Sequence, residues 1–394
     1  MTEDLLIILS SGGIAAALLV ISLLLTLPQA NRRANRCLAL LLGVLVLNLI
    51  HGFYSHSKMI EAVPYLFMLG FPTYLGLGPL LYFYTQAQTN PNWSFSPRQW
   101  AHFIPLLAVW LVLIPVFLQP AEIKQQMIIF GQGGGRAQWG AVFIAYIPIA
   151  LSIIGYSAAS LIVLRAHRRR ILNEFSSIEQ LNLNWLRGLA GFMILVSLSI
   201  LLPIPESVPR LYWFKIISVV LIFFIGHMGI RQPLIFHPRG ERRETESSEA
   251  DTSTQIQGQS TPIGQPDSAP GASRKYRSTG LDTVQAKHYW EQLREMMETE
   301  KLYLAPDLSL AELAQRLAIQ SAQLSQVINS CAHMNFYDFI NGHRIKTAQT
   351  LLLDDASPWS ILDIAMESGF NSKSTFYAQF KKHVGMTPTA YIKR

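Results

Sequence analysis

The sequence predicts an all-α protein: a bundle of seven transmembrane helices, followed by a cytoplasmic all-helical domain with two tandem helix-turn-helix units. Three observations lead to this prediction. Half of the 394 residues are hydrophobic and only 14% are charged, whereas soluble domains carry roughly 25% charged residues. Long apolar runs fill residues 1–230. A short helical pattern then occurs twice between residues 281 and 394.

Seven apolar runs make up the predicted membrane domain, residues 1–230. Most reach the length of about 20 residues that a helix needs to cross the hydrocarbon of a bilayer. The second run is short, and the third contains several Gly and Pro residues that predict breaks. The expected partner of this domain is the lipid bilayer. The expected spans are residues 5–27, 38–54, 63–86, 100–118, 139–164, 186–204 and 211–230.

Basic residues in the connecting loops predict the orientation of the spans. If the loops alternate between the two sides, twelve arginines fall on one side and only Lys58, Lys124, Arg136 and Arg210 on the other. Loops rich in Lys and Arg stay in the cytoplasm. We therefore expect a multi-pass protein of the bacterial inner (cytoplasmic) membrane, with its N-terminus outside and its C-terminal domain in the cytoplasm.

Few polar side chains lie within the expected spans. Such groups are candidates for function, although His102 and His227 lie near span ends and Asn48 equally suits a hydrogen bond between helices. Sensing of an unknown small-molecule or membrane signal is one hypothesis for Asn48, His51, His102 and His227. The two cysteines are far apart and form no C-x-x-C pattern, so we expect no metal site. Nothing indicates a cofactor.

Residues 231–280 predict a disordered cytoplasmic linker. Ser, Thr, Gln, Glu, Pro and Gly dominate this stretch, and large apolar residues nearly vanish. Such a segment cannot bury enough apolar surface to offset the entropy lost on ordering. We therefore expect that no signal passes through it as a stiff lever, and that proximity or association of two chains carries the signal instead.

The repeat lies in the domain of residues 281–394, after a helix predicted at residues 283–301. Apolar residues three and four positions apart describe two short helices in each copy. Ser309 with Glu312 and Ser360 with Asp363 are capping boxes at the start of each copy. The copies are offset by 51 residues through the first helix and the turn and by 52 in the second helix, which places an extra residue near Lys373.

A helical stripe between the two copies, residues 335–353, predicts a spacer helix about 28 Å long at 1.5 Å per residue. Successive major grooves on one face of DNA are about 34 Å apart. A rigid spacer of this size is therefore consistent with two recognition helices in adjacent grooves.

These motifs resemble the DNA-binding domain of AraC/XylS-type transcription regulators. The stretches that carry the resemblance are residues 308–314, 324–329 and 335–341, then Arg344, Ala348, Ile364-Ala365, Gly369-Phe370, Ser374, Phe376, residues 380–382, Gly385 and Thr387-Pro388. Two positions depart from the family pattern: His333 stands in place of a Gly, and Ala378 in place of an Arg of the second recognition helix. The resemblance implies sequence-specific binding of double-stranded DNA, which we expect of a homodimer.

The outward positions of the second helix of each unit are the expected DNA contacts. Gln and Asn suit adenine, and Lys suits guanine or phosphate. The family's base-facing positions favour Gln326 and Lys373. The domain holds eleven Lys/Arg and twelve Asp/Glu, so bulk charge adds little affinity. The expected contacts are Ala322, Gln323, Ser325, Gln326, Asn329, Lys373, Ser374, Tyr377 and Lys381.

The interpretation that unites the two halves is a membrane-embedded one-component transcription regulator, with the transmembrane half as sensor or anchor. The alternative is a membrane transporter or enzyme with an accessory helical protein-interaction domain. We find no H-E-x-x-H, G-x-S-x-G or P-loop motif, so no catalytic residue and no enzyme activity is expected. The spans hold almost no carboxylates and no duplicated half, which disfavours a transporter.

Overall fold

The computed structural model describes residues 2–26, 31–56, 62–66, 68–132, 136–179, 181–201, 210–231, 281–354 and 359–393. The described residues are helical apart from turns and one isolated β-bridge. The predicted linker lies outside them, except for Arg231. By their contacts the residues divide into one unit of Met1–His167 with Leu183–Phe236, and a second of Arg168–Asn182 with His237–Arg394.

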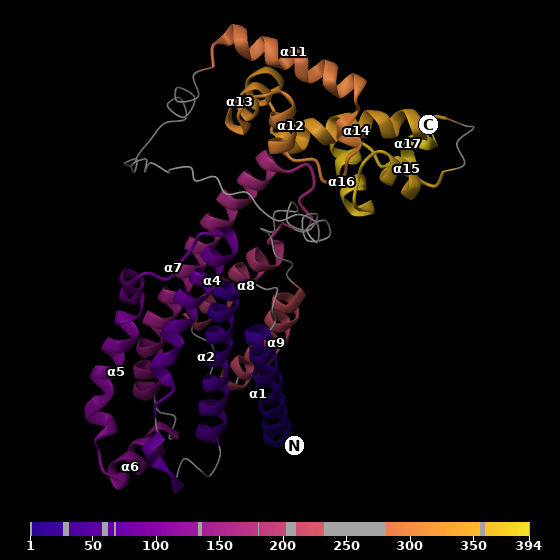
Figure 1. Cartoon of the computed structure of the whole chain (residues 1–394). Helices are drawn as coiled ribbons and strands as arrows, with labels where there is room; N and C mark the ends of the chain where they lie inside the picture. The colour runs from indigo at the N-terminus through magenta and orange to yellow at the C-terminus, as the bar shows by residue number, and fades with distance from the viewer. Residues whose placement is uncertain are drawn as a thin grey trace, which may run out of the picture. The chain divides into compact units, whose positions relative to one another are not determined.

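The first unit consists of long apolar helices (Figure 1). Helix α1 packs against α2 and α9, and α2 packs against α4. The third apolar run is broken as its Gly and Pro residues predict: two 3-10 turns precede a regular helix. The elements are α1 (Thr2–Thr26), α2 (Arg32–His56), η1 (Pro64–Leu66), η2 (Phe71–Gly76), α4 (Leu77–Thr89), η3 (Pro97–Phe103), α5 (Ile104–Phe117), α6 (Ala121–Gln132), α7 (Arg136–Glu174), α8 (Asn184–Ile200) and α9 (Arg210–Arg231).

Five of the described helical segments are long and apolar enough to cross a membrane, so the prediction of seven spans is not confirmed. Helix α8 has 17 residues, or about 26 Å at 1.5 Å per residue, less than the roughly 30 Å of hydrocarbon. In α9 the apolar stretch that qualifies is Ile216–Gly229, which is also short. The five candidates are Ile7–Thr26, Arg32–Tyr54, Pro64–Thr89, Pro97–Phe117 and Tyr146–Glu174.

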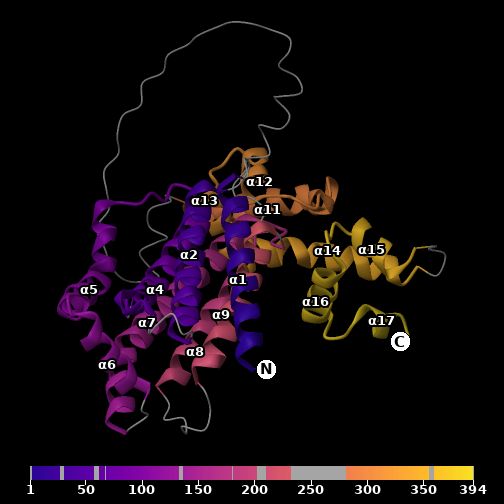
Figure 2. The same cartoon turned by 90° about the horizontal axis from the view of Figure 1, so that it is seen from below.

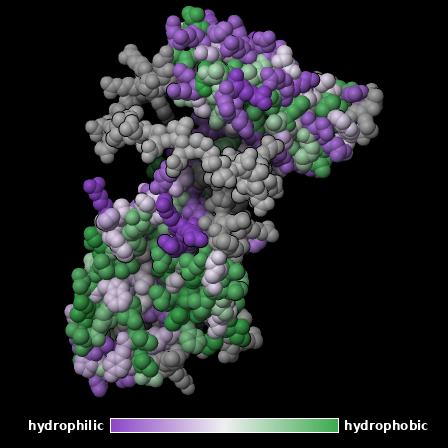
Figure 3. All heavy atoms as spheres, in the orientation of Figure 1, coloured by the Kyte–Doolittle hydropathy of each residue, from purple (hydrophilic) through white to green (hydrophobic). Residues whose placement is uncertain are grey.

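The face of the first unit that Figure 3 shows is largely hydrophobic. Helix α5 buries none of its residues, and Leu111 and Val112 are 65% and 76% exposed. Soluble proteins rarely expose contiguous apolar patches of more than a few hundred Å², and larger patches mark contact with protein or lipid. The outward side chains of α5 thus suit an apolar solvent.

Within its described residues 281–354 and 359–393, the second unit contains eight helical elements (Figure 1). The predicted helix at 283–301 ends two residues earlier, at Thr299. The 51-residue offset is reproduced by α12 and α15, which begin at Leu310 and Ile361. The elements are α11 (Thr283–Thr299), η4 (Leu302–Leu304), α12 (Leu310–Arg316), α13 (Ser321–Ala332), α14 (Phe336–Leu352), α15 (Ile361–Glu367), α16 (Lys373–Val384) and α17 (Pro388–Ile392).

Helix α14 joins two separate hydrophobic cores. Its first turns place Phe336, Phe339 and Ile340 in a core with α11, α12 and α13. Its last turns place Ile345 and Ala348 in a second core with α15 and α16. Both views show α14 between these two groups of helices (Figure 1, Figure 2). One continuous helix therefore sets the distance between the two helix-turn-helix units.

Candidate nucleic-acid interface

Each helix-turn-helix unit begins at the capping box that the sequence predicts. In the first unit, the amide of Glu312 donates to Ser309 Oγ at 3.2 Å, and the Ser309 amide donates to Glu312 Oε2 at 2.9 Å. In the second unit, Ser360 and Asp363 form the same pair of bonds at 3.3 and 2.9 Å. Each box gives an acceptor to two backbone amides at the start of the helix that have none within it. The boxes therefore fix the first residue of α12 and of α15.

The turn of each unit is built from the same backbone bonds. In the first, the amide of Ile319 donates to Ala314 O at 3.0 Å; in the second, Phe370 donates to Ala365 O at 3.0 Å. Both turns need a left-handed residue, which is Ala318 at φ +52° in one and Gly369 at φ +88° in the other. The repeat in the sequence is therefore a repeat in backbone geometry, and Ala318 adopts a conformation that costs a non-glycine residue roughly 1–2 kcal/mol.

The extra residue of the second helix-turn-helix unit is Asn371, which lies two positions before the predicted place near Lys373. Helix α13 starts right after its N-cap Gln320, which follows Ile319 directly, whereas Asn371 separates Phe370 from the N-cap Ser372 of α16. Gln320 holds the cap position of α13, and Ser321 is its first helical residue. Ser372 is the cap of α16, with its Oγ accepting from the Thr375 amide at 3.2 Å.

Some of the predicted contact residues of α13 already form hydrogen bonds within their own helix or its cap. Gln323 Oε1 accepts from the Gln320 amide at 3.0 Å, so its side chain closes the helix cap. Asn329 Nδ2 donates to Ser325 O at 2.8 Å along the same helix. Ala322 is exposed, and Ser325 and Gln326 are half-buried. Within this helix, Leu324, Val327 and Ile328 form the buried face.

Three of the four predicted contact residues of α16 lie on its exposed face, and the fourth, Tyr377, also packs against the core. Lys373, Ser374 and Lys381 are exposed, and Tyr377 is half-buried. The Nζ of Lys373 lies 5.6 Å from the centre of the Tyr377 ring, so these two side chains form one cation–π pair. The opposite face carries Phe376 and Phe380 into the core.

Sequence reasoning missed an ion pair that fixes α16 on the spacer helix. Lys382 Nζ lies 2.6 Å from Asp338 Oδ1 of α14. Asn335 caps α14 by accepting from the Asp338 amide at 2.8 Å, so Asp338 already stands at the positive end of that helix. In the sequence, only the Lys-Lys dipeptide at 381–382 pointed to this ion pair. It does not show that Lys382 pairs with Asp338 while Lys381 is exposed.

The four residues proposed for sensing do not form one site. Asn48 and His51 of α2 both face the 70–73 turn: Thr73 Oγ1 lies 3.5 Å from Asn48 Oδ1, and a Cβ on Gly70 would lie 2.8 Å from that of His51. His102 Nδ1 lies 2.7 Å from the Tyr156 hydroxyl. His227 is exposed on α9. Asn48 also donates to Val44 O of its own helix at 2.8 Å, which suits a structural role.

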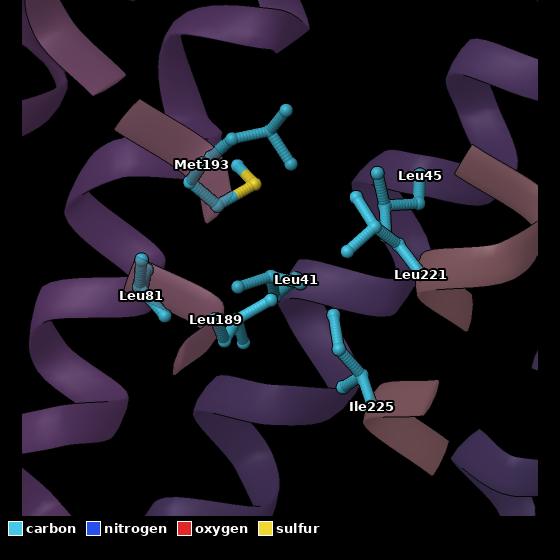
Figure 4. Close-up of a pocket in the computed structure, with 8 residues that line it drawn as sticks. Leu41, Leu45, Leu81, Leu189, Met193, Leu221 and Ile225 are labelled. Carbon is cyan, nitrogen blue, oxygen red and sulfur yellow. The ribbon is translucent and has the colours of Figure 1, made fainter. Parts of the chain in front are cut away.

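A small cavity lies where α2, α4, α8 and α9 meet (Figure 4). Its volume of about 10 Å³ is no more than the space of one water molecule. Its lining is apolar throughout, so it has no group that would orient a polar signal molecule. The lining residues are Leu41, Leu45, Leu77, Leu81, Leu189, Met193, Leu221 and Ile225. In the described residues no three His, Cys, Asp or Glu side chains gather to hold a metal.

Comparison with known proteins finds similarity in the C-terminal part of the chain. Residues 313–394 match the family model of a helix-turn-helix domain. The melibiose operon regulatory protein of Escherichia coli (strain K12) is 33% identical over 86 residues, which are 22% of this chain and 28% of that protein. An uncharacterized HTH-type transcriptional regulator of Staphylococcus aureus (strain COL) is 29% identical over 101 residues, 26% of this chain and 13% of that protein.

A solved structure of a Listeria innocua protein of unknown function is 28% identical, covers 29% of this chain and 97% of its own, and has a TM-score of 0.24. The match to the melibiose operon regulatory protein covers about a quarter of the length of that protein. The family match and the regulator relatives support an AraC/XylS-type helix-turn-helix domain at the C-terminus.

Proposed function

We propose that this chain is a membrane-embedded transcription regulator whose C-terminal domain binds double-stranded DNA through α13 and α16. The observation that carries the proposal is the duplicated unit: two turns with the same backbone bonds, each followed by a second helix with a buried apolar face and an outward polar face. In a helix-turn-helix protein this second helix enters the major groove. The relatives matched over this region are regulators by name.

The spacing of the two units also suits DNA. Helix α14 has 17 residues and is about 26 Å long at 1.5 Å per residue. Each of its ends is fixed in a different core. A rigid connection of this length supports placement of α13 and α16 in successive major grooves on one face of the duplex, about 34 Å apart.

Binding as a homodimer is part of the proposal. The eleven basic and twelve acidic residues of positions 281–394 give the domain no net positive charge, so phosphate attraction contributes little affinity to a single copy. Two copies double the number of base contacts, and confinement to a membrane raises their local concentration.

The membrane half is proposed as the sensor or anchor in the bacterial inner membrane. Five long apolar helices and the exposed side chains of α5 support insertion into lipid. The basic loops support an outside N-terminus and a cytoplasmic C-terminus. The DNA-binding domain then lies in the compartment that contains the chromosome.

The proposal is tested by mapping the genomic DNA that co-purifies with the full-length protein from cross-linked cells. A variant with Gln326→Ala and Lys373→Ala should lose the specific peaks, and a Lys287→Ala variant, altered at an exposed position of α11, should keep them. Enrichment of the same DNA by all three proteins would reject α13 and α16 as the reading elements.

A further inference from the structure

The residues that follow α7 pair with the DNA-binding domain. Phe175 forms an antiparallel bridge with Ser309, and the Ser176 amide donates to Leu308 O at 3.1 Å. Ser176 Oγ adds a long bond to Pro306 O at 3.4 Å. Residues 175–179, called the docking segment below, therefore lie along residues 306–309, which lead into α12, the first helix of the first helix-turn-helix unit.

The docking segment also supplies acceptors to a buried cation. Arg344 of α14 is 1% exposed, and its Nε and Nη2 donate to Tyr303 O and Ala305 O at 2.7 and 2.8 Å. Its Nη1 donates to Ser176 O and its Nη2 to Ser176 Oγ, both at 3.1 Å. Burial lowers the pKa of Arg344 to about 10, and the Glu179 carboxylate of the docking segment opposes that shift most strongly.

Removal of the docking segment would take one of the two acceptors of Nη1, leaving Asn341 Oδ1 at 3.3 Å, whereas Nη2 would keep Ala305 O and Pro306 O. A buried donor that loses its acceptor costs about 1–3 kcal/mol, and more when it is charged. The Arg344 site is thus complete only when Ser176 is seated, which makes this contact specific rather than a chance approach of two surfaces.

The docking segment also makes a hydrophobic contact with α14 and a polar contact with the second helix-turn-helix unit. Ile171 and Ile178 form a buried cluster with Tyr337 of α14, and the Tyr337 hydroxyl accepts from Gln379 of α16 at 3.4 Å. Asn371 Nδ2 donates to Ser177 Oγ at 3.0 Å and to Asp307 Oδ1 at 3.1 Å. Asn371 is the one residue that the second turn has in excess of the first, and it directly precedes the cap of α16.

We propose that the docking segment is a built-in regulatory element: when seated, it fixes α13 and α16 in the relative placement that reads DNA, and the membrane half controls DNA binding by seating or withdrawing it. The proposal rests on the DNA-binding function proposed above. The seated state is assigned as the DNA-competent one because the contacts that hold the segment come from residues 306–309, Tyr337, Arg344 and Asn371, none of which is a candidate base contact.

The connectivity of the chain suits this role. Helix α7 runs without interruption from Arg136 to Glu174, where the docking segment begins, and α8 starts at Asn184. A change in α7 relative to α8 therefore acts on the segment from both ends. Arg168, Arg169 and Arg170 place the start of this loop on the cytoplasmic side, as the basic residues place the C-terminal domain.

The seated contact is tested first by cysteine cross-linking of the full-length protein in native membranes. With Cys37→Ser and Cys331→Ser as background, Ser177→Cys with Asn371→Cys should form an intramolecular disulfide on mild oxidation. The matched pair Glu174→Cys with Asn371→Cys, which moves one cysteine to the exposed end of α7, should cross-link much less. Equal and slow cross-linking of the two pairs would overturn the docked arrangement.

The regulatory role is tested by DNA affinity of the full-length protein in lipid nanodiscs, with duplexes selected from random sequence by the wild type. Ile178→Asp should weaken binding at least tenfold, because it places a charge beside Tyr337, and Glu174→Gln should not change it. The Ser177→Cys and Asn371→Cys pair is then added to the Ile178→Asp variant. Oxidation to the disulfide should restore most of the DNA affinity, whereas a misfolded domain would not recover it.

The outcomes separate the two proposals. If the wild type selects DNA and Ile178→Asp binds it equally well, the regulatory role is wrong and the DNA-binding function stands. If the wild type selects no duplex, the DNA-binding function and the regulation built on it both fail, while the cross-link still reports whether the segment is seated.

Discussion

Ala318 and Gly369 occupy equivalent left-handed positions 51 residues apart, at φ +52° and +88°. Each amide closes its turn by donating to a carbonyl three residues back, at 3.1 Å to Gln315 O and at 2.9 Å to Met366 O. Their surroundings differ, since a Cβ on Gly369 would lie 2.8 Å from the carbonyl oxygens of Tyr303 and Leu304. The same turn is thus open to a side chain in the first unit and closed to it in the second.

Substitutions at these two positions should have opposite effects. Gly369→Ala should destabilise the domain by about 2–3 kcal/mol, because the added methyl meets backbone and the positive φ is strained. Ala318→Gly should stabilise it by about 0.5 kcal/mol, since relief of left-handed strain exceeds the entropy that Gly loses on folding. Hydrogen exchange of amides in α12 to α16 of the full-length protein measures both. Equal effects of the two substitutions would contradict the packing described for Gly369.

His343 should make the stability of the domain depend on pH. It is stacked on Tyr303 at 5.3 Å between ring centres and meets Phe339 edge-on at 5.0 Å. Burial, with help from Lys346, lowers the pKa of His343 below its ordinary value of 6.5. The folded state therefore favours the neutral ring, so its contribution is complete above pH 6.5 and is lost as the pH falls through the lowered pKa.

The expected result is that the free energy of unfolding of the domain falls between pH 6.5 and more acidic values, and that His343→Gln reduces this slope. Burial also lowers the pKa of His383, so that residue contributes in the same direction and some slope should remain. Substitution of the exposed His288 by Gln serves as the control. A slope that survives His343→Gln unchanged would show that another group titrates.

The salt dependence of DNA binding should report the lysines of α16. Lys381 is exposed and suited to a phosphate, so Lys381→Ala should lower the slope of log affinity against log salt by about one and weaken all sequences alike. Lys382 is held by Asp338 at 2.6 Å, so Lys382→Ala should alter the slope less. Titrations at several salt concentrations distinguish the two, and identical slopes for both variants would argue against the assigned faces of α16.

Reporter fusions decide between five and seven spans. A reporter fused after residue 132 should lie outside, and fusions after residues 182 and 243 should be cytoplasmic, because of the distribution of Lys and Arg. A fusion after residue 205 is the informative one: it lies outside if α8 and α9 both cross the membrane and inside if neither does. Periplasmic activity of the residue 243 fusion would overturn the proposed orientation.

Local signals in the sequence predicted much of the C-terminal domain. The capping boxes at Ser309 and Ser360 and the two short helices of each copy depend on residues within a few positions of one another, where helix periodicity and capping chemistry act. The change of offset from 51 to 52 residues also revealed an insertion, although its position at Asn371 required the structure.

These local signals could not predict contacts between residues that are far apart in the sequence. Ser176 and Arg344 are 168 residues apart, and their bonds use a backbone carbonyl and a hydroxyl that no periodicity marks. The bond between Gln323 Oε1 and the Gln320 amide was likewise not predicted, so the half-buried Gln323 caps α13 while its role as a DNA contact stays a prediction. The prediction of seven spans is not confirmed; one reason is that α8 is short, with 17 residues, and carries Arg187 in its first turn.

The most direct test of the central claim is a hydroxyl-radical footprint of the full-length protein on a duplex selected by the wild type. Two protected patches one helical turn apart on the same face are expected, and Gln326→Ala should weaken binding by about 1–3 kcal/mol and relax the preference at one base of a single patch. A single patch that Gln326→Ala leaves unchanged, or no protection on any selected duplex, would contradict DNA reading by α13 and α16.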